Sequence, residues 1–502
     1  MQNMNRYLFG TVFLTGASVL ILEVAAVRIL TPYYGSSLHV FSSVLTVILA
    51  ALSVGYWYGG ARADARQSID ELYTLITSSG VLVLALLLIA TIVLPKFGLI
   101  FPISFGPLIF SFILFFLPAF ILGIVSPYII KLQSVYTPAE EIGSVVGKTF
   151  FWGTMGSIVG SIASGFWLIP MIGVELSITF VSIILISVGV VTPLFLNRPL
   201  RKRWGIGTLT AVLIFGSCLY ILTIQRASTF VHQSNGLYSS IIIRDTTIYG
   251  KPARLLNRDT NNSSAIFLDT KDLVFDYTQF ANLYSTLKPD ARKMLMLGGG
   301  AYTIPRSIVA SDPQIEIDVV EIEPTLFTLA QEYFDLSDTS RITNYTQDAR
   351  VFLTQTDTEY DVIFVDLFST NLAAPFHLTT FEYYTLLHDH LTEGGVLILN
   401  YVGKPKVESP SLTGSVIKTL VSVFPDMQGF MINPKHITRS QNIMFVAQKN
   451  TSLGNLPESL PAHSAPLILE EMKLDLSIYA SNEEYLLTDD HAPIERLMMK
   501  QR

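Results

Sequence analysis

Seven apolar runs fill the first 226 residues and restrict how this part of the chain can fold. A helix that crosses a bilayer needs about 20 apolar residues, and each run meets that length: 7–31, 38–60, 73–94, 107–130, 149–171, 175–196 and 205–225. The first run is not a cleaved signal peptide, because its apolar part is too long and six comparable runs follow. We therefore predict that residues 1–226 form a polytopic α-helical bundle of about seven spans in the lipid bilayer of the cell (inner) membrane.

Two charged residues and a stripe of small residues stand out within these runs. Glu23 and Arg28 lie in or beside the first run, where charges are costly and usually face a partner or a cavity. They form either an internal ion pair or a functional polar site. Gly156, Gly160 and Ser164 recur at four-residue spacing in the fifth run, which is typical of tight helix packing. The alternative for this stripe is the lining of a substrate path.

Charge divides the chain into two halves. Residues 1–226 carry a net charge of +5, whereas residues 227–502 carry a net charge of −12 and have ordinary globular composition. The acidic half would repel phosphate, so a nucleic-acid partner is excluded. The single cysteine, Cys218, excludes an intrachain disulfide and a thiolate zinc site, and we expect no metal.

The second half begins with short β-rich segments. Residues 238–244 and 253–257 flank a turn at Tyr249-Gly250 and predict a small antiparallel sheet, which we assign to a β-strand subdomain at residues 227–285. Strands and helices then alternate, which indicates a parallel sheet of the Rossmann-like α/β class at residues 286–502. The expected strands are 294–297, 315–321, 341–345, 361–366 and 396–400, the last entered through a Gly394-Gly395 turn, and the expected helices are 304–310, 324–333, 350–354 and 381–391.

Polar residues at the carboxyl ends of these strands predict a nucleoside site. Gly298, Gly299 and Gly300 follow the first strand and allow a ligand to approach the backbone. Glu321 ends the second strand about 20 residues later, where a carboxylate accepts hydrogen bonds from both ribose hydroxyls. After the third strand, Asp348, followed by Ala349, can accept a hydrogen bond from the adenine amino group. A Walker lysine is absent, which argues against a triphosphate.

A further carboxylate, Asp366, ends the fourth strand and faces the reacting end of such a ligand. It can bind or deprotonate an amine, or stabilise a sulfonium cation; the alternative is a cap for the following loop. His377, in that loop, has either a role in the site or one in packing and hydrogen bonding.

These motifs together resemble spermidine synthase over about residues 235–450. The quoted segments are Leu297-Gly-Gly-Gly300, Val320-Glu-Ile-Glu-Pro324, Gln347-Asp-Ala-Arg350, Tyr360-Asp-Val-Ile-Phe-Val-Asp366 and Tyr383-Tyr384 with Gly394-Gly395. The whole chain is similar to membrane-fused spermidine synthase-like proteins, whose motifs also resemble Ile21-Leu-Glu23 with Arg28 and Leu487-Thr-Asp-Asp-His-Ala-Pro-Ile-Glu495.

The resemblance implies roles for individual residues. Glu321 would hold the ribose, Asp348 the adenine and the three glycines the nucleoside backbone, while Asp366 would deprotonate an acceptor amine before it attacks the carbon next to the sulfonium. Tyr277 falls where the family has a pocket tyrosine, and Asn262-Ser263 near its glutamine-containing turn. The implied co-substrate is S-adenosylmethionine or its decarboxylated form, and a homodimer stays open.

Two positions depart from the family pattern. The polyamine enzymes usually have aspartate after the three glycines and again three residues after the catalytic aspartate; here these positions are Ala301 and Ser369. Losing two carboxylates removes about 1.5–3 kcal/mol of charge-assisted contact each. Putrescine is therefore in doubt as the acceptor.

Three functions follow from this pattern. The first is a membrane-bound transferase that passes an aminopropyl group to a small amine and releases methylthioadenosine, or that passes a methyl group. The second is a lyase or cyclase that breaks the sulfonium without an acceptor. The third is a transporter or sensor whose second half only binds the nucleoside.

The orientation in the membrane is predicted in two conflicting ways. Basic residues place the N-terminus and three loops in the cytoplasm, so that seven spans would put the second half outside: Arg6, Arg62, Arg66, Lys131, Lys148, Arg198, Arg201, Lys202 and Arg203. S-adenosylmethionine, however, is made in the cytoplasm. We expect the second half to be cytoplasmic, because the supply of co-substrate is the stricter requirement.

Overall fold

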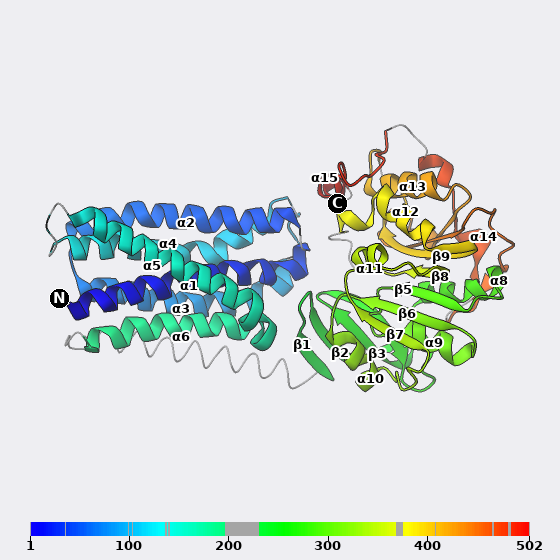
Figure 1. Ribbon diagram of the computed structural model, residues 1–502, viewed down its shortest axis with the longest axis horizontal. Coiled ribbons are helices and arrows are strands. Elements are labelled where there is room, and N and C mark those ends of the chain that lie inside the picture. Colours follow the sequence, from blue (N-terminus) through cyan, green and yellow to red (C-terminus); the bar gives the residue numbers. More distant parts are fainter. Residues whose placement is uncertain are drawn as a thin grey trace. The chain divides into compact units, whose positions relative to one another are not determined.

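The computed structural model describes residues 2–195 and 230–500, apart from residues 36, 99, 103, 136, 137, 139, 140, 368–374, 407, 464, 465 and 480–482. The chain divides into two compact units, Met1–Ser228 and Thr229–Arg502. Each unit is described by itself, with the element labels of Figure 1.

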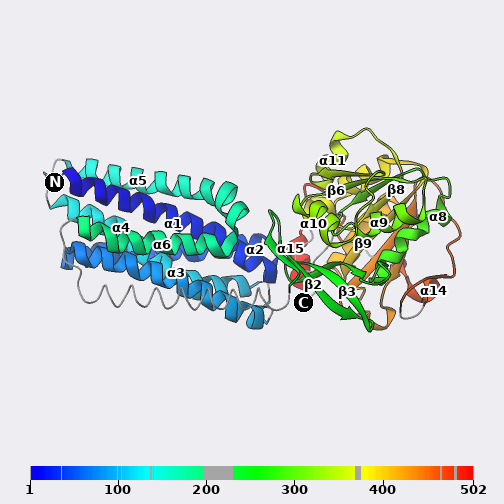
Figure 2. The ribbon, with the colours of Figure 1, turned by 90° about the horizontal axis from the view of Figure 1, so that it is seen from below.

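The first unit consists of long apolar helices that lie side by side (Figure 2). The helices are α1 (Gln2–Tyr34), α2 (Leu38–Ala65), α3 (Ile69–Phe97), α4 (Gly106–Ser134), α5 (Ile142–Ala163), a π-helical turn (Ser164–Leu168) and α6 (Ile169–Phe195). Helix α1 packs on α5, α2 on α4 and α3 on α6. These pairings bring segments that are distant in the sequence into contact.

Among the described residues of this unit, five helices are long and apolar enough to cross a membrane. The last of them, Ile142–Pro193, is 52 residues long and is broken at Gly173, whose φ of 81° no α-helix contains. The predicted runs 149–171 and 175–196 lie on either side of this break. The seventh run, 205–225, and Cys218 lie outside the described residues, so seven spans remain a prediction.

The glycine stripe of α5 lies against α1. A Cβ atom on Gly156 would overlap the backbone carbonyl of Phe13, and one on Gly160 the carbonyl of Ala17. The Ser157 hydroxyl donates to the carbonyl oxygen of Gly16 over 3.2 Å. Close approach of two backbones is what small residues permit in membrane helices, so the stripe serves helix packing.

We expect Gly156→Val to destabilise the bundle, because the valine side chain must displace the α1 backbone. Overpacking of this kind costs about 1–3 kcal/mol. Thermal unfolding of the full chain in detergent measures the effect, and Gly10→Val is the matched control, since nothing lies within 4 Å of a Cβ at that position. Equal melting temperatures for the two variants would contradict this packing.

The two charged residues of the first run, Glu23 and Arg28, both lie on α1 and are half-buried. They are five residues apart, a spacing that places two side chains on different faces of a helix. This spacing does not favour a direct contact between the two side chains, and both interpretations stay predictions.

The second unit begins with a four-stranded antiparallel sheet. Its strands are β1 (His232–Asn235), β2 (Ser240–Ile248), β3 (Lys251–Arg258) and β4 (Asn261–Phe267), in that order. The predicted strands 238–244 and 253–257 fall in β2 and β3, which pair antiparallel across a turn at Tyr249 and Gly250, both with positive φ.

An eight-stranded sheet forms the centre of this unit. Its order is β14-β10-β11-β9-β8-β5-β6-β7, and the five strands from β9 to β7 are parallel. The strands are β5 (Lys293–Leu297), β6 (Glu316–Glu321), β7 (Ile342–Thr346), β8 (Tyr360–Val365), β9 (Leu391–Gly403), β10 (Gln428–Met431), β11 (Gln441–Gln448) and β14 (Lys473–Leu474). The Rossmann-like α/β class is confirmed.

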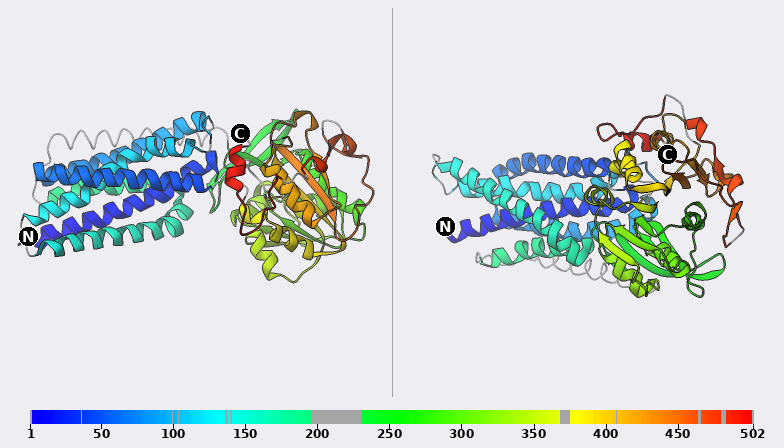
Figure 3. Two further views of the ribbon diagram at one scale, coloured as in Figure 1. Left: turned by 90° about the horizontal axis from the view of Figure 1, so that it is seen from above. Right: turned by 45° about the vertical axis from the view of Figure 1, so that its right-hand side comes forward.

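Helices cover both faces of this sheet (Figure 3). Side chains alternate along β5, so that Leu295 and Leu297 belong to one core, while Met294 and Met296 belong to the other. The first core contains residues of α11 (Ala349–Gln355), α12 (Phe381–Asp389), α13 (Leu412–Val423) and α15 (Ile494–Lys500). The second contains residues of α8 (Tyr284–Leu287), α9 (Thr303–Ser311), α10 (Thr325–Tyr333) and α14 (Leu469–Met472). The strands are therefore apolar on both faces.

The predicted boundaries between the last helix and the last parallel strand are wrong: α12 ends at Asp389, and Leu391 already belongs to β9. Gly394 and Gly395 do not precede the last parallel strand but lie inside β9, which starts at Leu391. Gly394 has a φ of 67°, and the pairing of β9 with β8 shifts between Tyr360 and Val362. The glycines therefore form an irregularity within a longer strand.

Candidate active site

The site lies where the strand order of the parallel sheet reverses. From β5 the chain proceeds to β6 and β7 on one side and then returns to β8 on the other. The carboxyl ends of β5 and β8 flank this switch point, where α/β sheets bind ligands. Gly298 follows β5 with a φ of 93°, and a Cβ atom there would overlap the carbonyl oxygen of Asp366. Only glycine allows this approach.

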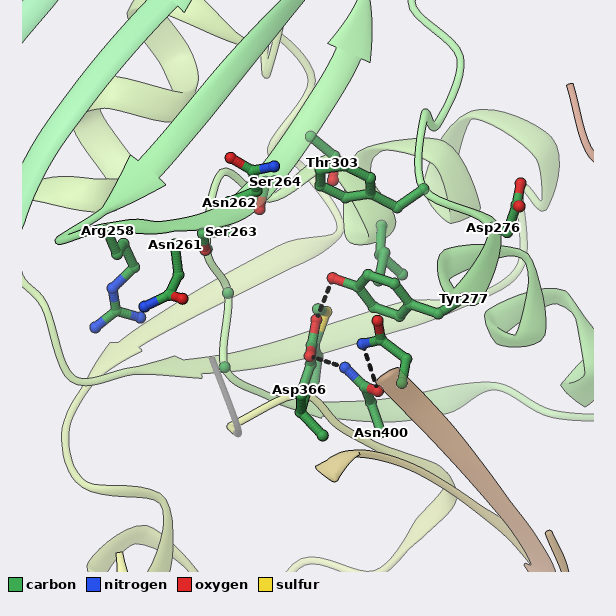
Figure 4. Close-up of a pocket in the computed structure, with 18 of the residues that line it drawn as sticks. Arg258, Asn261, Asn262, Ser263, Ser264, Asp276, Tyr277, Thr303, Asp366 and Asn400 are labelled. Atoms are coloured by element: carbon green, nitrogen blue, oxygen red, sulfur yellow. Dashed lines mark hydrogen bonds between the residues drawn. The ribbon is translucent and has the colours of Figure 1, made fainter. Parts of the chain in front are cut away.

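A cavity of about 370 Å³ opens at this point, a size within the usual range of ligand pockets. Figure 4 shows the polar side chains that surround it. The lining residues are Tyr249, Arg258, Asn261, Asn262, Ser263, Ser264, Phe275, Asp276, Tyr277, Met296, Gly298, Gly299, Gly300, Thr303, Ile304, Glu321, Asp366, Asn400, Val402, Ile432 and Asn442. Both sheets therefore contribute to one cavity.

Asp366 is held by hydrogen bonds on both of its oxygens. The Tyr277 hydroxyl donates to Oδ2 over 3.1 Å, and the Asn400 amide donates to Oδ1 over 2.7 Å. The Asn442 amide in turn donates to Oδ1 of Asn400 over 2.9 Å. This chain of contacts fixes the orientation of the Asp366 carboxylate in the cavity (Figure 4).

Burial raises the pKa of Asp366 above its ordinary value. The hydrogen bonds from Asn400 and Tyr277 stabilise the ionised form and oppose this increase, while the negative charge of Glu321 adds to it. A carboxylate with a raised pKa is a stronger proton acceptor than an exposed one.

Glu321 is buried beside the glycine turn. Its Oε2 accepts hydrogen bonds from the backbone N–H groups of Gly299 and Gly300 over 2.9 and 3.0 Å, and Oε1 accepts one from Glu323 N–H over 3.0 Å. Arg258 lies 3.6 Å from Oε1. The Glu321 carboxylate therefore holds the glycine turn in place. The ribose contact predicted for Glu321 stays a prediction.

Of the predicted pocket residues, Tyr277 and Asn262 line the cavity, but Ala301 does not. Ala301 is 1% exposed and packs among apolar side chains that include Ile241 and Leu256. Its N–H donates to the Ser264 hydroxyl over 3.1 Å. The left-handed φ of 54° at the next residue, Tyr302, accompanies this inward turn. Ala301 therefore does not line this cavity, in contrast to the predicted position in the substrate pocket.

Asp348, Ala349 and His377 are brought together away from the lining of this cavity. Asp348 caps helix α11 by accepting from the N–H groups of Arg350 and Val351, and its Oδ2 lies 3.4 Å from Nε2 of His377. The His377 contact is the main cause of the lowered pKa of Asp348. Ala349 is buried in the core. His377 therefore contacts Asp348 rather than lining the pocket; Ser369 lies outside the described residues.

Sequence reasoning missed several polar residues of the cavity, among them Arg258, Asp276, Asn400 and Asn442. Asn400 stood at the end of a predicted strand and could have been identified by that position. Arg258 and Asn442 carry no motif, because their proximity depends on the hairpin β3–β4 and on the antiparallel strand β11. In the described parts of the chain, no group of three or more His, Cys, Asp or Glu side chains is placed to hold a metal ion.

Comparison with known families agrees with this arrangement. Residues 277–455 match the spermine/spermidine synthase domain family, and this segment includes Tyr277, the glycine turn, Glu321 and Asp366. The similarity to this family thus lies within the second unit. Arg258, Asp276 and the helical unit lie outside the matched residues.

Proteins similar to this chain include aminopropyltransferases. The chain is 27% identical over 254 residues to a probable polyamine aminopropyl transferase of Bifidobacterium longum, covering 47% of this chain and 55% of the relative. It is 24% identical over 280 residues to the polyamine aminopropyltransferase of Vibrio vulnificus, covering 54% and 92%. The chain thus spans about half the length of the first relative.

Among solved structures, a probable spermidine synthase from Corynebacterium glutamicum is similar to this chain. The match has a TM-score of 0.43 and 24% identity, and covers 51% of this chain and 96% of that one.

Proposed function

We propose that the protein is a membrane-bound aminopropyltransferase of the spermidine synthase type. Its acceptor is an amine whose nitrogen forms a bond to the carbon next to the sulfonium of decarboxylated or intact S-adenosylmethionine. The carbon–sulfur bond breaks with its electron pair on sulfur, and methylthioadenosine is released. Asp366 accepts the proton that the amine nitrogen loses.

The observation that carries this proposal is the position and support of Asp366. The carboxylate lies at the switch point of the sheet, in the cavity, with both oxygens oriented by Tyr277 and Asn400. A general base must be both positioned and basic enough to act, and burial supplies the second property. Binding alone would not require such a group.

The residues around the glycine turn fit a nucleoside. Gly298 and Gly300 have positive φ, and the turn is fixed by Glu321. The lining of hydroxyls and amides from Asn261 to Ser264 offers donors and acceptors to a polar ligand. These groups would bind and orient the co-substrate with its sulfonium toward Asp366.

Product analysis tests the proposal. Purified full-length protein is incubated with intact or decarboxylated S-adenosylmethionine, with and without a polyamine. Methylthioadenosine formed only with the amine supports aminopropyl-type transfer, whereas methylthioadenosine without an amine indicates a lyase. S-adenosylhomocysteine would indicate methyl transfer, and binding without any product would contradict an enzyme.

The pKa of Asp366 predicts the pH dependence of the rate. Only the ionised carboxylate accepts a proton, so kcat/KM rises with pH through the raised pKa of Asp366. Tyr277→Phe removes a hydrogen bond that stabilises the ionised form, so the acid limb of the profile moves to higher pH. The loss in rate is greatest at acid pH.

Tyr249→Phe is the control for this shift, because Tyr249 lines the same cavity but does not share the Asp366 hydrogen bonds in the described structure. Superimposable pH profiles for wild type and Tyr277→Phe would show that another group controls the limb.

We further propose that the synthase unit faces the cytoplasm, where S-adenosylmethionine is made. A C-terminal reporter fusion that is active only in the cytoplasm would agree with this orientation. Activity only on the outer face would overturn it.

A further inference from the structure

One carboxylate in the cavity has no role in the proposed reaction. Asp276 precedes Tyr277 and lines the cavity together with Asp366. Its Oδ1 atom is buried without a hydrogen-bond partner among the described residues. Buried acceptors without partners are rare and costly, so this oxygen points to a ligand group that would satisfy it.

The surroundings of Asp276 fit a cation better than a neutral donor. Burial raises the pKa of Asp276, and only partial compensation comes from nearby His463. The Glu321 carboxylate has Arg258 beside it, whereas no lysine or arginine pairs with Asp276 in the described structure. An ammonium group would therefore meet a carboxylate that is not already neutralised.

Aromatic rings form the wall between the two carboxylates. The rings of Phe275 and Tyr277 stack nearly parallel, with centroids 6.1 Å apart and planes inclined by 16°, and Tyr249 also lines the cavity. Such rings contact the methylene groups of an alkylamine and attract its cationic end. Figure 4 shows Tyr277 between Asp366 and Asp276.

We propose that Asp276 binds the second cationic group of the amine acceptor while Asp366 deprotonates the first. Asp276 would therefore make the site favour an acceptor that carries a second amino group over a monoamine of the same length. The inference rests on the proposed function, because it concerns the acceptor of that reaction.

A comparison of acceptors tests the proposal. Wild type and Asp276→Asn, as full chains in detergent, are assayed with 1,4-diaminobutane and with n-butylamine, which has the same carbon chain and one amino group. We expect Asp276→Asn to raise KM for the diamine about 10- to 100-fold, with little change in kcat. The KM for butylamine stays within about twofold of wild type.

Asp272→Asn is the matched control, since it removes an exposed carboxylate four residues away that does not line the cavity. The assignment would be overturned if Asp276→Asn raised the KM for the diamine and for butylamine by the same factor. It would also be overturned if Asp276→Asn and Asp272→Asn had the same KM for the diamine. Calorimetric binding of the diamine to protein saturated with methylthioadenosine separates the two proposals. If wild type binds the diamine more tightly than Asp276→Asn but releases no product, the proposed reaction fails and the binding assignment stands.

A second inference comes from the C-terminal motif, which the proposed reaction does not use. Asp489 forms an ion pair with Arg350, with one contact of 2.7 Å, and accepts from the Thr380 hydroxyl over 2.8 Å. Arg350 also donates to the carbonyl oxygen of His377 over 2.9 Å. The carbonyl of Leu487 accepts from the N–H of Phe381 over 2.8 Å.

These contacts join the C-terminal segment to both sides of the Asp348–His377 pair. Arg350 follows Asp348 by two residues on α11, and its other contact holds the His377 backbone. We infer that Asp489 is a positioning residue, which holds His377 against the carboxylate expected to receive the adenine. This inference also rests on the proposed function.

The affinity for methylthioadenosine tests this role. We expect Asp489→Asn to raise the Kd about tenfold with little change in kcat, and Asp489→Glu to restore part of the affinity. Asp490→Asn, an exposed neighbour, should resemble wild type. Equal Kd values for Asp489→Asn and Asp490→Asn would overturn the positioning role of Asp489. A lower kcat of Asp489→Asn at unchanged Kd would also overturn this role. If Asp489→Asn does not fold, Thr380→Val serves instead, because it removes the hydroxyl that donates to Asp489 and leaves the Arg350–Asp489 ion pair in place.

Discussion

Asp366→Asn is expected to reduce kcat by about 10²–10⁴-fold, the range typical of a lost general base. An amide cannot accept a proton from the amine, yet it has nearly the shape of the carboxylate. The cavity should therefore stay intact, and the Kd for methylthioadenosine should remain within about threefold of wild type. Single-turnover measurements with saturating co-substrate give the rate, and calorimetry gives the affinity.

Asp290→Asn is the control for a lost carboxylate, because the Asp290 side chain is 80% exposed. We expect it to leave both quantities unchanged. If Asp366→Asn keeps its turnover, Asp366 is not the general base. If the affinity for methylthioadenosine falls by the same factor as kcat, Asp366 mainly binds the nucleoside.

Glu321→Gln is expected to weaken both nucleoside binding and folding. Oε2 of Glu321 accepts two backbone hydrogen bonds, and a glutamine can present only one oxygen in place of two. Each lost charge-assisted hydrogen bond costs about 1.5–3 kcal/mol, and Arg258 loses its counterion. We expect a fall in the free energy of unfolding of this size and an increase in Kd for methylthioadenosine of about 100-fold.

The opposite end of the same strand supplies the control. Glu316 begins β6 and is exposed, so Glu316→Gln removes the same charge without touching the glycine turn. If both variants bind methylthioadenosine as wild type does, Glu321 has only a structural role. If Glu321→Gln loses affinity at unchanged stability, the hydrogen bonds to the glycine turn matter less than the predicted ribose contact.

Much of the site could be predicted because its residues end strands of a parallel sheet. Gly298, Glu321 and Asp366 each follow or close an apolar strand, and the carboxyl ends of such strands meet at one edge. Periodicity alone therefore located these groups. The same reasoning placed Asp348 correctly at the end of β7, but it could not show that its carboxylate caps α11.

Other parts of the site depend on contacts between distant segments. Asn442 reaches Asn400 only because β11 pairs antiparallel with β9. Ala301 turns inward because the strands of the first sheet pack against it. Asp276 was visible beside Tyr277, yet only the cavity shows that one of its oxygens has no partner.

The sequence by itself determined the division into an apolar helical part and an acidic α/β part, the order of the strands along the chain and the carboxylates at their ends. These follow from composition and periodicity, which are local properties of the chain. The tertiary structure decided which residues meet: the Asn442–Asn400–Asp366–Tyr277 chain, the unpartnered oxygen of Asp276 and the break at Gly173. Spatial neighbours are set by strand order and helix packing, which depend on the whole chain at once.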